Sequence, residues 1–416
     1  MLAAVVAAGV SLGLRVAEAQ VDQARAATYF AEAAALCARE GGRLWGVSLC
    51  GPIVIADATS RSFATSEPAP SAPRPAALGY ANAAMRWGDK RWTTIVWQLI
   101  PANEHARGRV LLHELYHRIQ PQIGLFVREP TNDHLDSVDG RYWLQLEWRA
   151  LAKALGSSGA ERLIATRDAL AFRTKRRQLF PGAAENEQLL EINEGLAQYT
   201  GTVGAAASVR EAESDAIDQL TRAAEIPTFV RTFAYWTGAA YGILLDAAVP
   251  GWTRRMTPQT DLGQLLMHAT GSAAGLDPDS AAVKYGGEQL RASEIARSEQ
   301  QAARVAEFRR RFAEDPVLVL PAGRNASFVS LGVTPIPGFG TIYPSYRVTA
   351  DWGSLEAAQV LVSPDRTELR LPAPANLTGP ALTGDGWTLQ LAPGWSVRRG
   401  NRAGDFLVTR DSVKKS

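Results

Sequence analysis

The sequence predicts an α+β chain in which a mainly helical domain with a small sheet precedes a small all-β domain. Three patterns lead to this fold class. Short strand-like segments lie between residues 44 and 100, apolar residues recur at helical spacing from Tyr142 to Phe312, and alternating segments bounded by Gly, Pro and Asp follow Pro316. A chain of 416 residues can hold two such domains. We place them at residues 20–320 and 321–416.

The residues before position 20 have the layout of a secretory signal peptide, residues 1–19. The apolar run Leu2–Leu14 is too short to span a bilayer, and Ala17-Glu18-Ala19 has the small residues of a cleavage site. The mature chain would begin at Gln20, in the periplasm or outside the cell, with no stable membrane insertion. No Lys or Arg precedes the apolar run, so a cytoplasmic protein with an N-terminal helix stays open as the alternative.

Local patterns predict the elements that precede residue 101. We expect a helix over residues 22–38 and a loop over residues 67–75, which hold four prolines. Runs rich in β-branched and aromatic residues predict strands at Leu44–Leu49, Ile53–Ala56, Arg61–Ser66 and Thr93–Ile100.

Two cysteines, Cys37 and Cys50, are the only ones in the chain. In an oxidising compartment an isolated pair indicates one disulfide, which would tie the first helix to the segment after it. Two buried thiols are the alternative.

The remaining elements follow from the same patterns. Breaks between helices are expected at residues 156–159, 181–182, 250–251 and 275–279, where Gly and Pro gather. In the tail, strands are expected at Val329–Val333, Tyr346–Ala350, Val360–Ser363, Glu368–Leu371, Trp387–Leu391 and Phe406–Thr409.

Charge excludes one class of partner. The formal net charge is +2, and no basic run carries interleaved aromatic residues. A nucleic-acid partner is therefore not expected.

The stretch His113-Glu114-Leu115-Tyr116-His117 carries the clearest chemistry. Asn103 and Pro121 bracket a helical pattern around it. Residues i and i+4 share a face of a helix, so both imidazoles can reach one metal ion, and zinc binds imidazole nitrogen readily. Glu114 lies about 100° around the helix axis from His113, where it can accept a proton from water. A catalytic zinc needs a third protein ligand.

The segment Asn193-Glu194-Gly195-Leu196-Ala197-Gln198-Tyr199 resembles the second signature of gluzincins, the zinc peptidases that include thermolysin and the aminopeptidase-N-like enzymes. The resemblance implies a zincin-like metallopeptidase domain, with Glu194 as third ligand to Zn²⁺ beside His113 and His117. It also implies an edge strand that pairs with the substrate backbone. Glu194 follows His117 by 77 residues, which is longer than usual for the group. The metzincin alternative fails because Ile123 stands where that group has its third His.

Glu147 is the rival third ligand. It borders an apolar helical stripe that includes Leu144 and Trp148. A carboxylate at the edge of a buried face needs a partner, and an ion pair with Arg149 or another arginine would also satisfy it.

Tyr235-Trp236-Thr237-Gly238 is similar to a Tyr-x-Lys-Gly element of aminopeptidase-N-like enzymes, with Thr237 in place of Lys. The similarity implies that the Tyr235 hydroxyl stabilises the oxyanion. Packing in the core with a local hydrogen bond is the alternative.

Zinc-bound imidazoles are normally oriented by outer carboxylates. Thermolysin-like enzymes place an Asp four residues after the ligand Glu, where this chain has Gln198. The orienting group is therefore expected elsewhere, with Asp133, Asp136 and Asp139 as candidates.

These features predict a zinc-dependent hydrolase, with a peptide or protein as substrate and Glu114 as general base. Two alternatives stay open: a zincin-fold scaffold without catalysis, and a zinc hydrolase of a non-peptide amide or ester. In either reading the C-terminal β domain can bind a partner or substrate.

Overall fold

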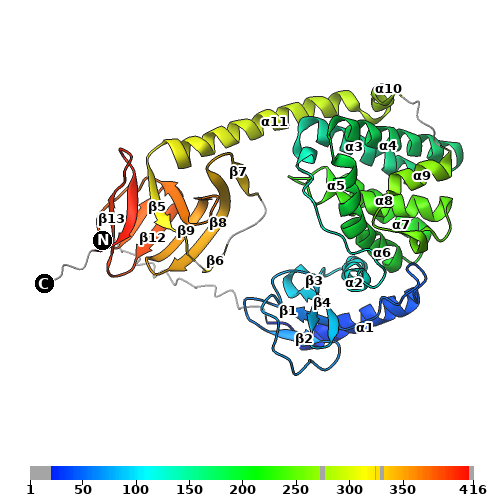
Figure 1. Ribbon diagram of the computed structural model, residues 1–416, viewed down its shortest axis with the longest axis horizontal. Helices are drawn as coiled ribbons and strands as arrows, with labels where there is room; N and C mark the ends of the chain where they lie inside the picture. The colour runs from blue at the N-terminus through cyan, green and yellow to red at the C-terminus, as the bar shows by residue number, and fades with distance from the viewer. Residues whose placement is uncertain (1–19, 272–276, 324, 328–331, 412–416) are drawn as a thin grey trace, which may run out of the picture. The chain divides into compact units, whose positions relative to one another are not determined.

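The computed structural model describes residues 20–271, 277–323, 325–327 and 332–411 (Figure 1). The chain divides into two compact units, of which the first ends at Arg291 and the second begins at Ala292. The first unit combines helices with a small sheet, and the second is mostly β-sheet. The α+β class expected from the sequence is confirmed at this level. The expected signal peptide, residues 1–19, lies outside the described residues.

Four strands form the sheet of the first unit in the order β2-β1-β4-β3. Strand β1 runs parallel to β4, whereas β2 and β3 run antiparallel to their neighbours. Because β3 is last in the strand order, it is an edge strand. Their bounds are β1 Ile53–Ala56, β2 Phe63–Thr65, β3 Ala83–Trp87 and β4 Lys90–Val96. The expected strand Thr93–Ile100 is β4, which ends earlier because Trp97–Leu99 forms a short 3₁₀ turn.

The two faces of this sheet are covered differently. On one face Ile53, Ile55 and Ile95 join the main apolar core. On the other face Val54 and Trp92 pack in a smaller cluster. This division follows from the alternation of side chains along a strand. Figure 1 shows helix α2 (Glu104–Ile119) beside β3 and β4, which it contacts.

The other helices of the first unit pack around the main core. The breaks expected at 156–159, 181–182 and 250–251 each separate two helical elements, and residues 272–276 lie outside the described residues. The helices are α1 Gln23–Glu40, α3 Val138–Leu155, α4 Gly159–Leu179, α5 Ala183–Leu190, α6 Leu196–Ala205, α7 Val209–Ala223, α8 Phe233–Ala248, α9 Leu262–Thr270, α10 Pro278–Ala282 and α11 Gly287–Arg309, in which the division between the units falls.

The expected strand Leu44–Leu49 is wrong, because this segment is a buried turn. Gly42 and Gly46 adopt positive φ angles of 77°, which end an extended path. The Glu40 carboxylate accepts the N–H groups of Gly42 at 2.9 Å and Leu44 at 2.6 Å. The apolar side chains fill the core as a folded turn, which a strand pattern cannot distinguish.

The expected link between Cys37 and Cys50 is present as a disulfide. It joins the last turns of α1 to the segment before β1. Such a bond is compatible with an extracellular location. Within the described part of the chain, no helix combines the length and apolar character needed to cross a bilayer.

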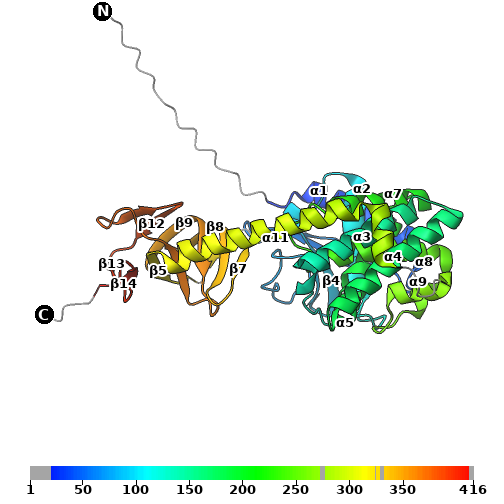
Figure 2. The same ribbon diagram turned by 90° about the horizontal axis from the view of Figure 1, so that it is seen from above.

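The second unit holds a sheet in the order β11-β12-β9-β10-β5-β14-β13, with β6 and β7 attached through β8, a partner of β9. Strands β8, β9 and β12 run side by side (Figure 2). The strands are β5 Val317–Pro321, β6 Asn325–Ser327, β7 Thr334–Ile336, β8 Gly340–Ala350, β9 Gly353–Val362, β10 Glu368–Pro372, β11 Ala381–Gly384, β12 Trp387–Leu391, β13 Trp395–Arg399 and β14 Phe406–Arg410.

Five of the six strands expected in the tail coincide with β8, β9, β10, β12 and β14. The sixth, Val329–Val333, lies mostly outside the described residues. The boundary expected at residue 320 falls inside β5, which pairs with β10 and β14 of the second unit. Leu318 and Leu320 of β5 are buried in that unit's core.

Candidate metal centre

Helix α2 places both motif imidazoles on one face. The Asn103 side chain caps its start by accepting the N–H of Ala106 at 2.9 Å. The helix ends at Ile119, two residues before Pro121. His113 is buried and His117 is half-buried one turn later.

A close crossing brings α6 against α2. A Cβ atom on Gly201 would lie 2.4 Å from the carbonyl oxygen of Arg109, so only glycine lets the two backbones approach this closely. Glu194 lies one turn before α6, in the π-helical turn Glu191–Gly195. Single π turns inside helices are frequent at functional sites.

The crossing of α8 fixes the other side of this turn. A Cβ atom on Gly238 would lie 2.2 Å from the Cα atom of Gly195. The two glycines therefore bring the first turn of α8, which carries Tyr235, next to Glu194.

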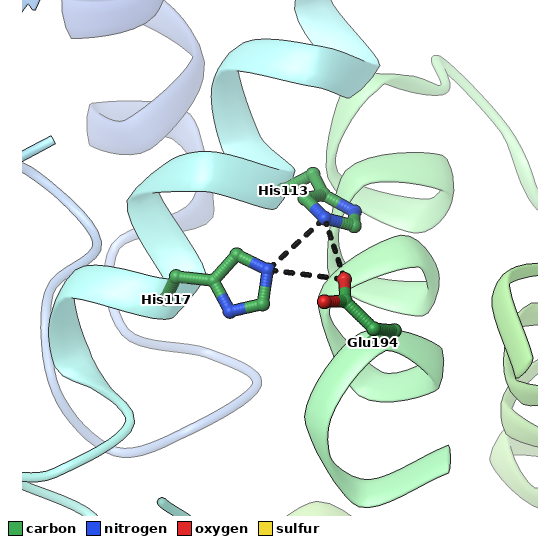
Figure 3. A group of neighbouring side chains, drawn as sticks. All are labelled: His113, His117 and Glu194. Carbon is green, nitrogen blue, oxygen red and sulfur yellow. Dashed lines mark hydrogen bonds and ion pairs between the residues drawn. The ribbon is translucent and has the colours of Figure 1, made fainter. Parts of the chain in front are cut away.

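His113, His117 and Glu194 converge on one point (Figure 3). The two Nε2 atoms are 3.1 Å apart, and each is 3.4 Å from Glu194 Oε2. Ligands about 2.0–2.1 Å from a tetrahedral zinc ion are separated from each other by about 3.3–3.4 Å. The three atoms thus have the spacing of one face of such a site.

Two glutamines orient the imidazoles. Gln120 donates its amide N–H groups to the backbone carbonyl and the side-chain oxygen of Asn193, both at 3.2 Å. Its Oε1 therefore accepts from His117 Nδ1 at 2.7 Å. Gln198 Oε1 lies 3.2 Å from His113 Nδ1. With Nδ1 as donor, each neutral imidazole presents an unprotonated Nε2 to the centre.

The centre is consequently rich in acceptors. Glu194 Oε2 is buried, and its neighbours at 3.4 Å are the two Nε2 atoms. With both imidazoles neutral and protonated on Nδ1, it has no hydrogen-bond donor among the described residues. Burial alone would lower the pKa of His117, but the Glu194 carboxylate opposes this and raises it to about 9. Burial would raise the pKa of Glu194, but the two imidazoles hold it far below its ordinary value. A positive charge is favoured at this point, and two imidazoles with one carboxylate form a donor set that fits zinc.

Glu114 is buried beside this trio and faces a cleft of about 520 Å³. Asn82 Nδ2 donates to Glu114 Oε1 at 3.1 Å. The cleft is also lined by the three converging residues and by Tyr235. The structure therefore brings all five site residues expected from the sequence to one place.

The Tyr235 ring stacks on His113, with centroids 5.5 Å apart and planes 5° from parallel. Burial, followed by the charge of Glu194, raises the pKa of its hydroxyl well above the ordinary value. The hydroxyl thus stays protonated near neutral pH and can donate a hydrogen bond in the cleft.

The rival ligand Glu147 lies elsewhere. Its carboxylate pairs with Arg176 and with Arg173 at 3.3 Å, and it accepts the Tyr241 hydroxyl at 2.7 Å. Glu147 is therefore part of a buried ion network and not of the converging trio. Glu147 thus makes the ion pair expected as the alternative to metal binding, but with Arg173 and Arg176 and not with Arg149.

The orienting groups were expected among Asp133, Asp136 and Asp139, but the side chains that contact the two Nδ1 atoms are Gln120 and Gln198. Asp136 accepts the hydroxyl of Thr228, and Asp139 pairs with Arg291. Gln198, from which no orienting role was expected, contacts the Nδ1 atom of His113. Gln120 was missed, although its place three residues after His117 is the available signal.

Comparison of the chain with models of protein families, with curated proteins and with solved structures finds no significant match. Functional inference therefore rests on the residues of this chain.

Proposed function

We propose that the protein is a zinc-dependent hydrolase of gluzincin type that cleaves peptide bonds. The observation that carries the proposal is the convergence of His113, His117 and Glu194 at the ligand spacing of a tetrahedral zinc ion, with Glu114 beside them in a cleft.

Each side chain has a part in this chemistry. A zinc ion held by the trio would supply a Lewis acid that polarises a carbonyl and acidifies water. Glu114, whose Oε1 accepts from Asn82, takes the proton from water and returns it to the leaving amine. The Tyr235 hydroxyl donates a hydrogen bond to the oxyanion that develops on the substrate carbonyl.

A peptide substrate fits the surroundings of the cleft. Residues Tyr80–Asn82 line it and lead directly into β3, one of the two edge strands of the sheet. An edge strand offers unpaired backbone groups to which an extended chain can add. This arrangement supports a zincin-like reading of the first unit.

The long spacing between the two metal motifs has a structural explanation. Helices α3, α4 and α5 occupy the interval between His117 and the π-helical turn. The buried network of Glu147, Arg173 and Arg176 joins two of these helices. None of the described residues that line the cleft belongs to α3, α4 or α5.

Export belongs to the proposal as well. The Cys37–Cys50 disulfide fits a periplasmic or secreted protein, and the sequence of residues 1–19 fits a signal peptide. Mass spectrometry of protein from a secreting host should give a chain that begins at Gln20. Retention of residues 1–19 would favour the cytoplasmic alternative.

The test is cleavage of a mixed peptide library by zinc-loaded protein, followed by mass spectrometry. The parent should produce new termini, and Glu114→Gln should bind zinc equally but lose roughly 10²-fold to 10⁴-fold in rate. Equal rates for parent and Glu114→Gln would overturn the assignment of the base. No cleavage by the parent would leave the scaffold or non-peptide alternatives.

A further inference from the structure

Among the described residues, Asn82 is the one whose side-chain amide donates a hydrogen bond to Glu114. Its Nδ2 donates to Glu114 Oε1 at 3.1 Å, while its Oδ1 accepts the backbone N–H of Val96 at 2.9 Å. Because a backbone N–H can only donate, the Oδ1 and Nδ2 positions are fixed by the contact with Val96. The amide can therefore present only its N–H side to Glu114.

The backbone around Asn82 is held as firmly as its side chain. The Thr94 hydroxyl lies 2.9 Å from the carbonyl oxygen of Ala83 and 3.4 Å from that of Ala81, on either side of Asn82. Thr94 is buried in β4, next to Thr93, whose hydroxyl lies 3.5 Å from the Glu114 backbone carbonyl. Strand β4 thus fixes both partners of the Asn82–Glu114 hydrogen bond.

We infer that Asn82 is a positioning residue for Glu114, holding the carboxylate in one orientation through Oε1. This inference rests on the proposed function. A carboxylate has two equivalent oxygens and a broad terminal torsion, so a base without this contact would sample orientations in which neither oxygen meets the water. Proton transfer depends on such geometry.

The same contacts allow a purely structural role, in which Asn82 only accepts from Val96. Two substitutions separate the roles. Asn82→Ala removes both contacts, whereas Asn82→Asp keeps the acceptor for Val96 and replaces the donor to Glu114 by a second carboxylate, which repels it. The matched control is Asn186→Asp, because Asn186 lies on α5 and its amide donates to the Thr131 carbonyl outside the cleft.

The experiment measures kcat, KM, zinc content and thermal unfolding for each zinc-loaded variant on a peptide that the parent cleaves. Both Asn82 variants should lose roughly 10-fold to 100-fold in kcat, as expected for one lost hydrogen bond to a charged group. Their KM should stay within about threefold, and Asn82→Ala should keep the zinc content of the parent. In a Glu114→Gln background, Asn82→Ala should cause no further loss, because the two residues act as one unit.

Three results would overturn the inference: parental kcat in Asn82→Ala, a raised KM with unchanged kcat, or losses that multiply in the double variant. A crystal structure of zinc-loaded Asn82→Ala gives an answer that does not need activity. The Glu114 carboxylate should leave its parental orientation, and an unchanged carboxylate would contradict the inference. An inactive parent would count against the proposed function instead.

Discussion

Replacing Glu194 by Gln removes a charge from the trio while keeping its shape. The side chains of His113, His117 and Glu194 are only 8%, 15% and 10% exposed, so water screens little of the attraction between a metal ion and the carboxylate. The carboxylate is the single anion among the three, and without it two neutral imidazoles would face the buried ion. Removing one partner of a buried charge pair costs roughly 3–5 kcal/mol, or about two to four decades in Kd.

The assay is zinc titration of metal-free protein against a chromophoric chelator at constant pH. Glu194→Gln should weaken zinc binding by at least about 100-fold. The control is Glu185→Gln, the same chemical change at an exposed position in the first turn of α5, which should bind zinc like the parent. If Glu194→Gln binds within threefold of the parent, the trio is not the metal site and the gluzincin assignment fails with it.

Four further outcomes follow, three from the contacts around the site and one from the disulfide. Gln120→Ala should weaken zinc binding by roughly 10-fold to 100-fold, measured by the same titration, because His117 loses its orienting partner. The pKa of His117 is raised to about 9, so zinc must displace a proton from His117 below that pH. Zinc affinity should therefore fall roughly tenfold per pH unit on acidification. Calorimetry in buffers of different ionisation enthalpy should show the release of the proton. The raised pKa also stabilises the metal-free fold below pH 6.5, and this contribution is lost as pH rises through 9. Replacing Cys37 and Cys50 by Ser should lower the free energy of unfolding, measured by urea denaturation, by about 3 kcal/mol, as for a loop of this length. An unchanged urea midpoint would show that the disulfide does not stabilise the fold.

The parts of the fold that the sequence predicts are those set by local periodicity. The helices and their breaks follow from apolar spacing and from Gly and Pro. Helix α2, which carries His113 and His117, follows from the capping residue Asn103 and from Pro121. Leu44–Leu49 was mistaken for a strand because its apolar residues are buried in a turn, held by the Glu40 carboxylate. Edge strand β3 was not foreseen, since its side chains are mostly half-buried and give no clear alternation.

The candidate site divides along the same line. Residue types and spacing predict that His113, His117 and Glu194 meet. Gly195 and Gly238, which permit one of the helix crossings, lie within the segments named from the sequence, whereas Gly201 lies outside them. The partners of these residues could not be read in this way. Gln198 and Asn82 lie 85 and 32 positions from the groups they contact, and only the packing of helices on the sheet brings them together.

The most direct test of the central claim combines zinc content with cleavage on one sample. Protein purified without added metal or chelator should carry close to one zinc ion per chain. Removal of the zinc should abolish cleavage of the peptide library, and one equivalent should restore it. A chain that binds no zinc, or one that cleaves equally well after its zinc has been removed, would contradict the assignment of a zinc-dependent hydrolase.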